Sequence, residues 1–487
     1  MRLSSLDLAI LAAYLIGITL FGIHFRRGQK DIRDYFLGGR TAPWWALAFS
    51  IVATETSTLT IIGTPALAFA GNLGFLQLVL GYMVGRVLLS VLFLPRYFRG
   101  EFYTAYQLIE RRFGGRMKSV AATTFLVTRA LAEGVRIAAI GKVVSVAFGT
   151  DTRLSVVVVM SLTLIYTFEG GMKAVIWTDV VQLMLYLTGS VAAFVLLLDR
   201  IPGGWSEVTQ VAAAAGGKFR IFDFTFSLTQ TYTFWSGLLG GTFLTMASHG
   251  TDQSIVQRLL AARSERQGVA ALLASGGIIL VQFTLFLVLG VMLYAFHQHA
   301  PLIVAGGDTD RIFPEFVVRE MPAGLKGLVL AAIGAVAMSN ASGSLNSMAA
   351  SSVVDIYHVS GSEADPARVL RLSRWATLLW GAVLLVLGLV RWGPVLEAGL
   401  TIASITFGSL LGLFLLAFFN RRATPNGALA GMITGLAVLL YAKFGSPLAW
   451  TWFVLLGAVT TYLVGSLASL LGRGTPSHPA AAADRTS

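Results

Sequence analysis

Apolar runs of about 20 residues follow one another along almost the whole chain. A helix of this length crosses the hydrocarbon core of a bilayer and satisfies its own backbone hydrogen bonds there. The runs do not alternate in polarity as the short strands of an outer-membrane barrel do. We therefore expect an all-α polytopic membrane protein with about 13 transmembrane helices. The expected spans are 4–25, 43–71, 74–98, 118–149, 153–170, 172–199, 229–261, 266–297, 325–358, 370–392, 396–420, 425–444 and 450–472.

The composition excludes several classes of protein. Only 12% of the residues are charged, against about 25% in a soluble domain. A disordered chain, a soluble enzyme with one anchor and a nucleic-acid-binding protein are therefore excluded. The chain has no cysteine, which removes disulfides and Cys-based metal sites. The expected surroundings are the lipid bilayer and a small solute, without nucleic acid.

The Lys and Arg residues are distributed unevenly between the two sides of the expected membrane. The formal net charge is +12, from 36 Lys and Arg against 24 Asp and Glu. With the loops assigned alternately to the two sides, 22 basic residues fall on one side and 10 on the other. Basic loops stay in the cytoplasm. We expect a multi-pass protein of the plasma (inner) membrane with its N-terminus outside and its C-terminus cytoplasmic.

The second span is unusually polar, with seven hydroxyl or carboxyl side chains between Ser50 and Thr60 and with Gly63 and Pro65 following. Polar residues inside a membrane normally face a cavity or a partner. A helix that unwinds here would free backbone carbonyls, which coordinate Na⁺ in broken transporter helices. The alternative is a Ser/Thr-rich packing face with a proline kink.

The ninth span carries small polar residues at helical spacing. Ser339, Ser342, Gly343 and Asn346 lie at i, i+3, i+4 and i+7 and form one stripe. Two hydroxyls one turn apart can share a small hard cation. The alternative is a seam for helix packing, which is the more common use of such stripes.

Asp179 lies a few residues inside the sixth span. A carboxylate within a membrane indicates a functional site by default. The alternative is an interfacial Asp that pairs with Lys173 or with a basic loop residue. Both interpretations remain open from the residues alone.

Five segments, in their order and separation, resemble the sodium/solute symporter family over roughly residues 5–420. The resemblance implies a LeuT-type fold, with two inverted five-helix repeats around a midplane site. The five segments are DYFLGGRTAPWW, SIVATETSTLTIIGTP, YTFEGGMKAVIWTDVVQ, HGTDQSIVQRLLAA and MSNASGSLNSMAASSVVDIY. The implied organisation is a leading helix and basic loop (1–42), a first repeat (43–199), a connection (200–228), a second repeat (229–420), two trailing helices (421–472) and a disordered tail (473–487).

The resemblance also implies the ligands of a Na⁺ site shared by the family. The backbone carbonyls of Ala53 and Thr56 would come from the second span. The ninth span would add the carbonyl of Val336 and the side chains of Ser339 and Asn340. The family usually has Ser or Thr where Asn340 stands, so the longer amide alters the geometry of this site. Hard oxygen ligands suit an alkali cation.

Some members of the family have a second Na⁺ site, and its positions here are Asp179, Ser342 and Gly343. Gly343 has no side chain, so this second site is incomplete. We therefore expect one Na⁺ per substrate, with Asp179 coupling the sixth span to the ninth through Ser342.

Three residues are candidates for the substrate side of the site, namely Glu55, Thr60 and Asp252. The sugar-carrying branch of the family has Asn and Gln where Glu55 and Thr60 stand, which disfavours sugar. Glu55 would bind a substrate cation, accept a proton, or pair with Arg86, Arg129 or Arg136. Pairing ranks first because buried charges need partners.

The expected function is Na⁺-coupled symport of a small organic solute, preferably an organic acid or an amino acid, by alternating access. A sugar or vitamin symporter of the same family is the alternative, and an ion channel is the alternative from another class. We do not expect an enzyme, because no nucleophile–base pair or metal motif is recognisable. No GxxxxGK[ST] loop occurs in the sequence, which argues against ATP as the driving force.

Overall fold

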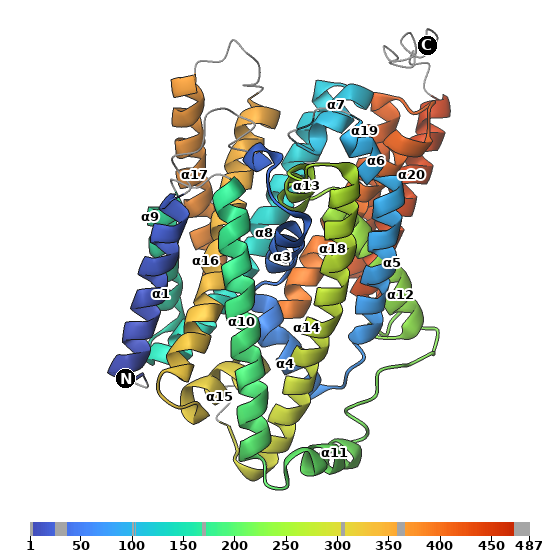
Figure 1. Cartoon of the computed structure of the whole chain (residues 1–487). Helices are drawn as coiled ribbons and strands as arrows, with labels where there is room; N and C mark the ends of the chain where they lie inside the picture. The colour runs from blue at the N-terminus through green and yellow to red at the C-terminus, as the bar shows by residue number, and fades with distance from the viewer. Residues whose placement is uncertain are drawn as a thin grey trace.

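The computed structural model describes residues 3–24, 37–99, 102, 104–167, 172–302, 307–357 and 366–471. Within these ranges every regular element is helical and no strand occurs. The long helices form one bundle, with the start of α1 and the end of α20 at opposite ends (Figure 1). We call these ends the N-terminal face and the C-terminal face.

The bundle and its connections contain the following elements, in chain order: α1 (Ser5–His24), η2 (Gly38–Arg40), α3 (Trp44–Glu55), α4 (Thr58–Ala70), α5 (Leu76–Leu92), α6 (Leu94–Phe98), α7 (Tyr106–Phe113), α8 (Gly115–Phe148), α9 (Thr152–Thr167), α10 (Met172–Arg200), α11 (Gly204–Ala214), α12 (Phe234–Gly250), α13 (Gln253–Leu260), α14 (Glu265–His299), η4 (Thr309–Arg311), α15 (Ile312–Glu320), α16 (Leu325–Ser351), the π-helical turn η5 (Ser352–Ile356), α17 (Pro366–Gly388), α18 (Val395–Phe419), α19 (Pro425–Gly445), η6 (Trp450–Trp452) and α20 (Phe453–Leu471).

The all-α membrane architecture expected from the sequence is confirmed, whereas the number of spans is not. A helix lies in each of the thirteen expected segments. Among the described residues, seven helices are long and apolar enough to cross a membrane, and up to nine if each bent pair is one span. The difference arises because several segments are short or interrupted, such as the apolar stretches Ser5–Ile18 and Trp375–Gly388. The count of thirteen stays a prediction.

Two of the expected spans are broken near their middle. α3 and α4 meet at a bend of 64° at Thr56 and Ser57. Ser57 then caps α4 by accepting a hydrogen bond from the N–H of Leu59 at 3.2 Å. Asp252 caps α13 in the same way, accepting from the N–H of Ser254 at 2.8 Å. Cap residues inside apolar sequence therefore end one helix and start the next at both places.

Both breaks lie in the first span of an expected repeat, 43–199 or 229–420. α3, α4 and α13 pack against α14 around the middle of the bundle, α3 also packs against α10, and α4 and α13 pack against α16 (Figure 1). α5 and α12 pack closely enough that a Cβ at Gly81 would lie 2.6 Å from the carbonyl oxygen of Gly237. This packing places two helix interruptions, with their unpaired backbone groups, in the interior of the bundle.

Candidate functional site

The break between α3 and α4 releases backbone carbonyl groups. The N–H of Thr56 still bonds to the carbonyl of Val52 at 2.7 Å, so the helix is intact up to that point. The next amide, Ser57 N–H, would reach Ala53 in a continuous helix, but it points to Oγ1 of Thr60 at 3.4 Å. The last carbonyls of α3, including that of Ala53, therefore lose their helical partners.

α16 meets this break through Asn340. Its Nδ2 donates to the backbone carbonyl of Thr56 at 3.1 Å, across 284 residues of sequence. The hydroxyl of Thr56 is held by Gln282, whose Nε2 lies 2.7 Å from it. Of the expected Na⁺ ligands, Thr56 and Asn340 are thus brought together, and Ala53 and Val336 are buried in α3 and α16. The Ser339 side chain lies outside the part of the chain that the structure describes.

Asp179 of α10 is held by an arginine and a serine. Its Oδ2 accepts from Nη2 of Arg258 at 3.0 Å and from the hydroxyl of Ser50 at 2.6 Å. Nε of Arg258 also donates to the Ser50 hydroxyl at 2.8 Å, which closes a triangle among the three groups. Arg258, which lies within the expected span 229–261, is buried in α13. These bonds tie α10 to α3 and α13. Ser342 and Gly343 are half-buried on α16, and the expected link from Asp179 to α16 through Ser342 stays a prediction.

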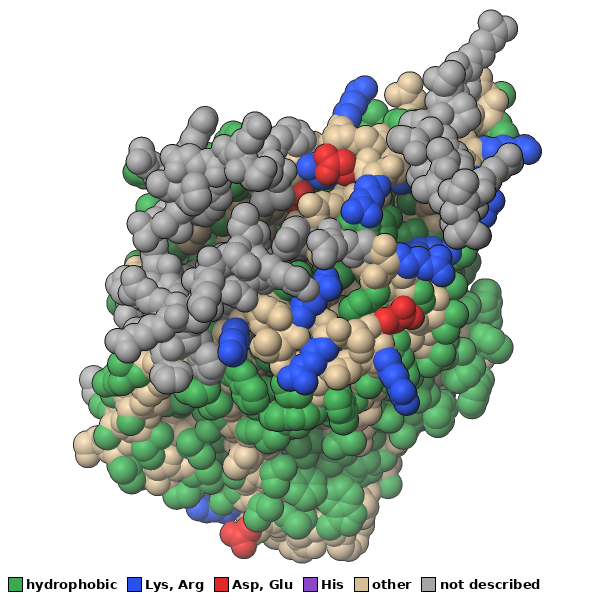
Figure 2. Space-filling view, turned by 45° about the horizontal axis from the view of Figure 1, so that its top comes forward, with side chains coloured by type: hydrophobic (Ala, Val, Ile, Leu, Met, Phe, Trp, Pro, Cys, Tyr) green, Lys and Arg blue, Asp and Glu red, His purple; other side chains and the backbone are tan. Residues whose placement is uncertain are grey.

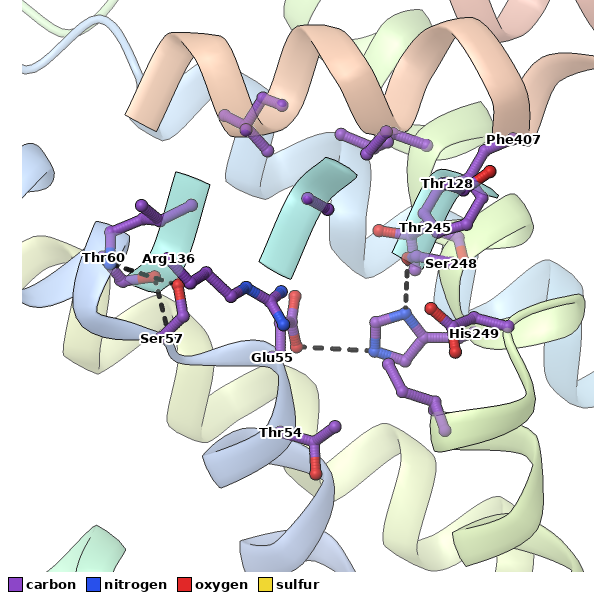
Figure 3. A pocket seen from close by; sticks show the side chains of 18 of the residues that line it. Thr54, Glu55, Ser57, Thr60, Thr128, Arg136, Thr245, Ser248, His249 and Phe407 are labelled. Carbon is purple, nitrogen blue, oxygen red and sulfur yellow. Dashed lines mark hydrogen bonds and ion pairs between the residues drawn. The ribbon is translucent and has the colours of Figure 1, made fainter. Parts of the chain in front are cut away.

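An interior cavity of about 120 Å³ lies between the two helix breaks. Figure 3 shows Glu55 and Thr60 beside the first break, with Arg136 and His249 reaching into the same space. Asp252, at the second break, lines the cavity as well. All three substrate-side candidates therefore share one cavity. Much of the remaining wall is apolar and aromatic, including Phe75, Tyr82, Phe125, Phe283, Leu396 and Phe407.

Glu55 is paired in the way that ranked first from the sequence, and Arg86 is its partner. Nη2 of Arg86 donates to Oε2 of Glu55, and Nε2 of His249 lies 3.4 Å from the same oxygen. Nδ1 of His249 lies 2.9 Å from the hydroxyl of Ser248. The sequence analysis did not predict His249 as a site residue. The polar segment HGTDQ within an apolar span could have indicated it.

A second charged cluster borders the cavity on α8. Nη1 of Arg129 lies 3.4 Å from Oδ2 of Asp252, and its Nε donates to Ser344 at 2.8 Å. Arg136 donates to Glu133 at 3.0 Å, and Ser344 donates to the same carboxylate at 2.9 Å. The buried Nε of Arg136 has no hydrogen-bond partner among the described residues. Arg136 therefore keeps donor capacity on the cavity side.

The oxygen atoms at the first break fit an alkali cation better than a transition metal. They are backbone carbonyls and one side-chain amide, which are hard ligands. Among the described residues, no group of three or more His, Cys, Asp and Glu side chains is placed to hold a metal ion.

A model of the sodium:solute symporter family matches residues 35–435 of the chain. The chain belongs to the sodium:solute symporter family. The symporter is 30% identical over 481 residues to the sodium/sialic acid symporter SiaT of Proteus mirabilis, covering 96% of this chain and 95% of the relative. It is also 30% identical to the human sodium/iodide cotransporter over 462 residues, which cover 91% of this chain and 70% of the relative.

The fold agrees with this membership. A solved Na⁺-coupled sialic acid symporter, in a substrate-bound outward-open state, superposes with a TM-score of 0.86 at 28% identity. The match covers 97% of this chain and 99% of that one. The symporter is therefore a secondary active transporter that couples the movement of a small organic solute to Na⁺.

Proposed function

We propose that the symporter carries a small organic anion, bound in the cavity between the two helix breaks, together with Na⁺ bound where α3 ends. The observation that supports this proposal most strongly concerns the guanidinium of Arg136. It lines the cavity with a buried Nε that has no partner among the described residues. A carboxylate is the natural partner for such a group, because the planar guanidinium fork matches two carboxylate oxygens.

The acidic groups around the cavity favour an anion over a cation as substrate. Glu55 is already paired with Arg86, and Asp252 with Arg129 and the first turn of α13. An organic cation or ammonium group would have to break one of these pairs. Sugar is disfavoured because neither Glu55 nor Thr60 has an amide side chain that would bind the hydroxyl groups of a sugar. Sialic acid, the substrate named for two relatives, is an organic acid.

Charge balance supports coupling between the anion and Na⁺. If His249 is neutral, the charges that line the cavity and their ion-pair partners sum to zero, because three arginines are matched by three carboxylates. An added anion alone would leave one negative charge uncompensated in a poorly solvated space, which is costly. One Na⁺ taken up at the neighbouring break restores neutrality. The six charged residues are Glu55, Glu133, Asp252, Arg86, Arg129 and Arg136.

The Na⁺ site that we propose uses the carbonyls of Ala53 and Thr56 with Val336, Ser339 and Asn340. The contact between Asn340 and Thr56 supports it, since the amide joins the break to α16. Na⁺ held there would order the end of α3 and thereby raise the affinity of the adjacent cavity for the anion. By linkage the anion raises the affinity for Na⁺ by the same factor.

One Na⁺ per substrate is the stoichiometry that we propose. Arg258 already supplies a positive charge 3.0 Å from Asp179. A second Na⁺ at Asp179 would have to displace or approach this guanidinium, and Gly343 offers it no hydroxyl. Asp179 then serves to hold α10 to α13 and α3 through Arg258 and Ser50.

The orientation that we propose places the N-terminus outside and the C-terminus in the cytoplasm of the plasma membrane. Figure 2 shows Lys and Arg side chains gathered at the C-terminal face, where acidic ones are few. Basic cytoplasmic loops are the usual determinant of orientation. Exposed members of this group are Arg99, Arg111, Arg116, Arg263, Arg266, Arg421 and Arg422.

The test is uptake by proteoliposomes of radiolabelled organic anions, amino acids and sugars under an imposed Na⁺ gradient. We expect accumulation of an organic anion against its gradient, which a channel does not achieve, and poor support by K⁺. Arg136→Gln should abolish the uptake, whereas Arg153→Gln, at an exposed site outside the cavity, should not. Equal uptake of the anion by Arg136→Gln would overturn the proposed substrate class.

A further inference from the structure

The first turns of α18 pack against α4 at very short distances. A Cβ added at Gly63 would lie 2.7 Å from Cβ of Leu396, and one at Gly399 would lie 2.5 Å from Cδ1 of Leu59. Real Cβ atoms do not approach other atoms so closely, so a side chain at Gly63 would push the two helices apart, whereas one at Gly399 would displace the terminal methyl of Leu59. We call these two contacts, Gly63–Leu396 and Leu59–Gly399, the outer seal.

The outer seal separates two hollows. The substrate cavity lies on one side, and a hollow of about 340 Å³ lies on the side of the N-terminal face. Phe75 and Leu396 line both of them, so these two side chains form the partition. The direct route from this hollow to the cavity runs between α4 and α18.

The carboxylate of Asp310 holds the end of α18 that forms this seal, and the hydroxyl of Tyr232 also bonds to Glu397 in the first turn at 3.2 Å. Oδ2 of Asp310 accepts from the backbone N–H of Val395, the first residue of α18, at 3.1 Å. The first amides of a helix lack helical partners, and a negative charge beside them is favoured by the helix dipole. Asp310 comes from η4, in the connection between α14 and α16, and its side chain is only 4% exposed.

The same carboxylate is tied to α8. Nζ of Lys142 lies 2.8 Å from Oδ2 of Asp310 and 3.0 Å from Oδ2 of Asp308. Arg311 lies 3.7 Å from Asp308 and donates to the hydroxyl of Thr152 on α9 at 3.3 Å. Since η4 also packs against α4, Asp310 links α18 to both α8 and α4. The carboxylate of Asp308 pairs instead with Lys142 and Arg311.

We propose that Asp310 is the positioning residue of an outer gate, holding the first turn of α18 on α4 so that the outer seal stays closed until this tie is released. The proposal depends on the proposed function in one respect only, namely that the solute enters from the N-terminal face. Asp310 does not touch the substrate cavity, so it acts through Val395 and the adjoining Leu396. Opening the cavity toward the N-terminal face requires α18 to leave α4, which breaks the bond between Asp310 and the Val395 amide.

The chain offers a clean readout, because it has no native cysteine. A single Ala403→Cys substitution places a thiol in the wall of the cavity, beyond the outer seal. The rate at which a membrane-impermeant methanethiosulfonate labels this thiol, with full-length protein in oriented proteoliposomes, measures how often the seal opens. Asp310→Asn should label roughly tenfold faster, because a charge-assisted hydrogen bond is lost from the closed state alone.

Lys142→Gln should act in the same direction, and it serves as the second variant if Asp310→Asn does not fold. Asp308→Asn is the matched control, since it removes a partner of Lys142 and leaves the Val395 bond in place. It should label at the parent rate, and Asp310→Glu should restore most of the slow labelling. In uptake assays an outer gate that opens more easily should lower both the apparent KM for Na⁺ and the maximal rate.

Two results would overturn the proposal. One is an unchanged labelling rate in folded Asp310→Asn and Lys142→Gln. The other is equal acceleration by Asp308→Asn, which would mean a general loosening of the connection. The assay needs no known solute, so it stands even if the uptake panel finds no anion. If labelling is faster only when the reagent is added on the opposite side of the membrane, the role of the Asp310–Val395 bond is supported and the proposed orientation is refuted.

Discussion

The side-chain amide of Asn340 donates to the backbone carbonyl of Thr56 at 3.1 Å, although 284 residues separate the two. Thr56 stands where α3 ends, and Asn340 lies in the middle of α16. The contact joins the two expected repeats at the point where the first one is unwound. Since Nδ2 makes this bond, the amide oxygen of Asn340 is the atom that would bind Na⁺ in the proposed site.

Replacing Asn340 by Ala should weaken the use of Na⁺. The change removes an amide oxygen from the proposed Na⁺ site and the link between α16 and the break. We expect the Na⁺ concentration for half-maximal uptake to rise about tenfold or more, since a good ligand contributes at least about 1.4 kcal/mol. Initial rates of uptake as a function of Na⁺ concentration measure this.

Asn340→Ser tests whether a hydroxyl can replace the amide, and it should keep most of the Na⁺ affinity. Thr284→Ala is a suitable control, because among the described residues that hydroxyl bonds only to the carbonyl of Leu280, within α14, at 2.8 Å. An unchanged Na⁺ dependence in Asn340→Ala would remove this residue from the site.

The ion pair between Asp179 and Arg258 should be visible in a double-mutant cycle. Both side chains are buried, at 2% and 6% exposure, so each single variant leaves one buried charge without its partner. Breaking such a pair costs about 3–5 kcal/mol. We expect Asp179→Asn and Arg258→Met each to lower the thermal midpoint strongly, and the double variant to cost clearly less than their sum. Additive losses would show that the two groups do not depend on each other.

Gly343→Ser should leave the stoichiometry at one Na⁺ per substrate. A Cβ at Gly343 meets no atom within 4 Å, so the serine fits without strain. It restores the hydroxyl that the second Na⁺ site of the family would use, while Arg258 continues to neutralise Asp179. The ratio of Na⁺ to solute flux, obtained from reversal potentials in proteoliposomes, decides this. A rise from one to two would mean that the missing hydroxyl, and not Arg258, limits the site.

Asp355 should make stability depend on pH near the C-terminal face. The membrane-length helix of the expected span 325–358 ends at Ser351, so Asp355 lies outside it, in the turn η5. Burial raises the pKa of Asp355 from 3.8 to about 6. The folded protein then binds this proton more tightly than the unfolded chain does. The buried carboxylate therefore lowers the free energy of unfolding above pH 6, and this loss disappears as the pH falls below 6.

Asp355→Asn should therefore raise the free energy of unfolding at neutral pH, by about 1–3 kcal/mol, and change little near pH 4. Thermal midpoints of the purified protein across this pH range measure the effect. Asp199→Asn, at an exposed position, is the control and should show no such trend. An equal shift at both ends of the range would contradict the assignment to this carboxyl.

The unwinding of the second span was one of two interpretations that the sequence left open, and the structure decides for it. Cap chemistry explains why the signal was readable. Ser57 and Thr60 are spaced to cap a new helix inside an apolar run. The second break carries the same kind of cap at Asp252, yet it was not expected, because a single polar cluster in HGTDQ resembles an ordinary polar patch.

The sequence by itself determined the all-α membrane architecture, because hydrophobicity and helix periodicity are local properties of the chain, and its ordered motifs indicated the family. It left the break at Thr56 and Ser57 as one of two interpretations, which the structure decided. Only the tertiary structure decided which charges meet. Asp179 pairs with Arg258 of α13, whereas Lys173 was the partner that the sequence suggested. Glu55 pairs with Arg86, which is one of its three candidate arginines. A buried charge pairs with whichever opposite charge the packing of other helices brings within about 4 Å. That packing cannot be predicted from the local sequence around either residue.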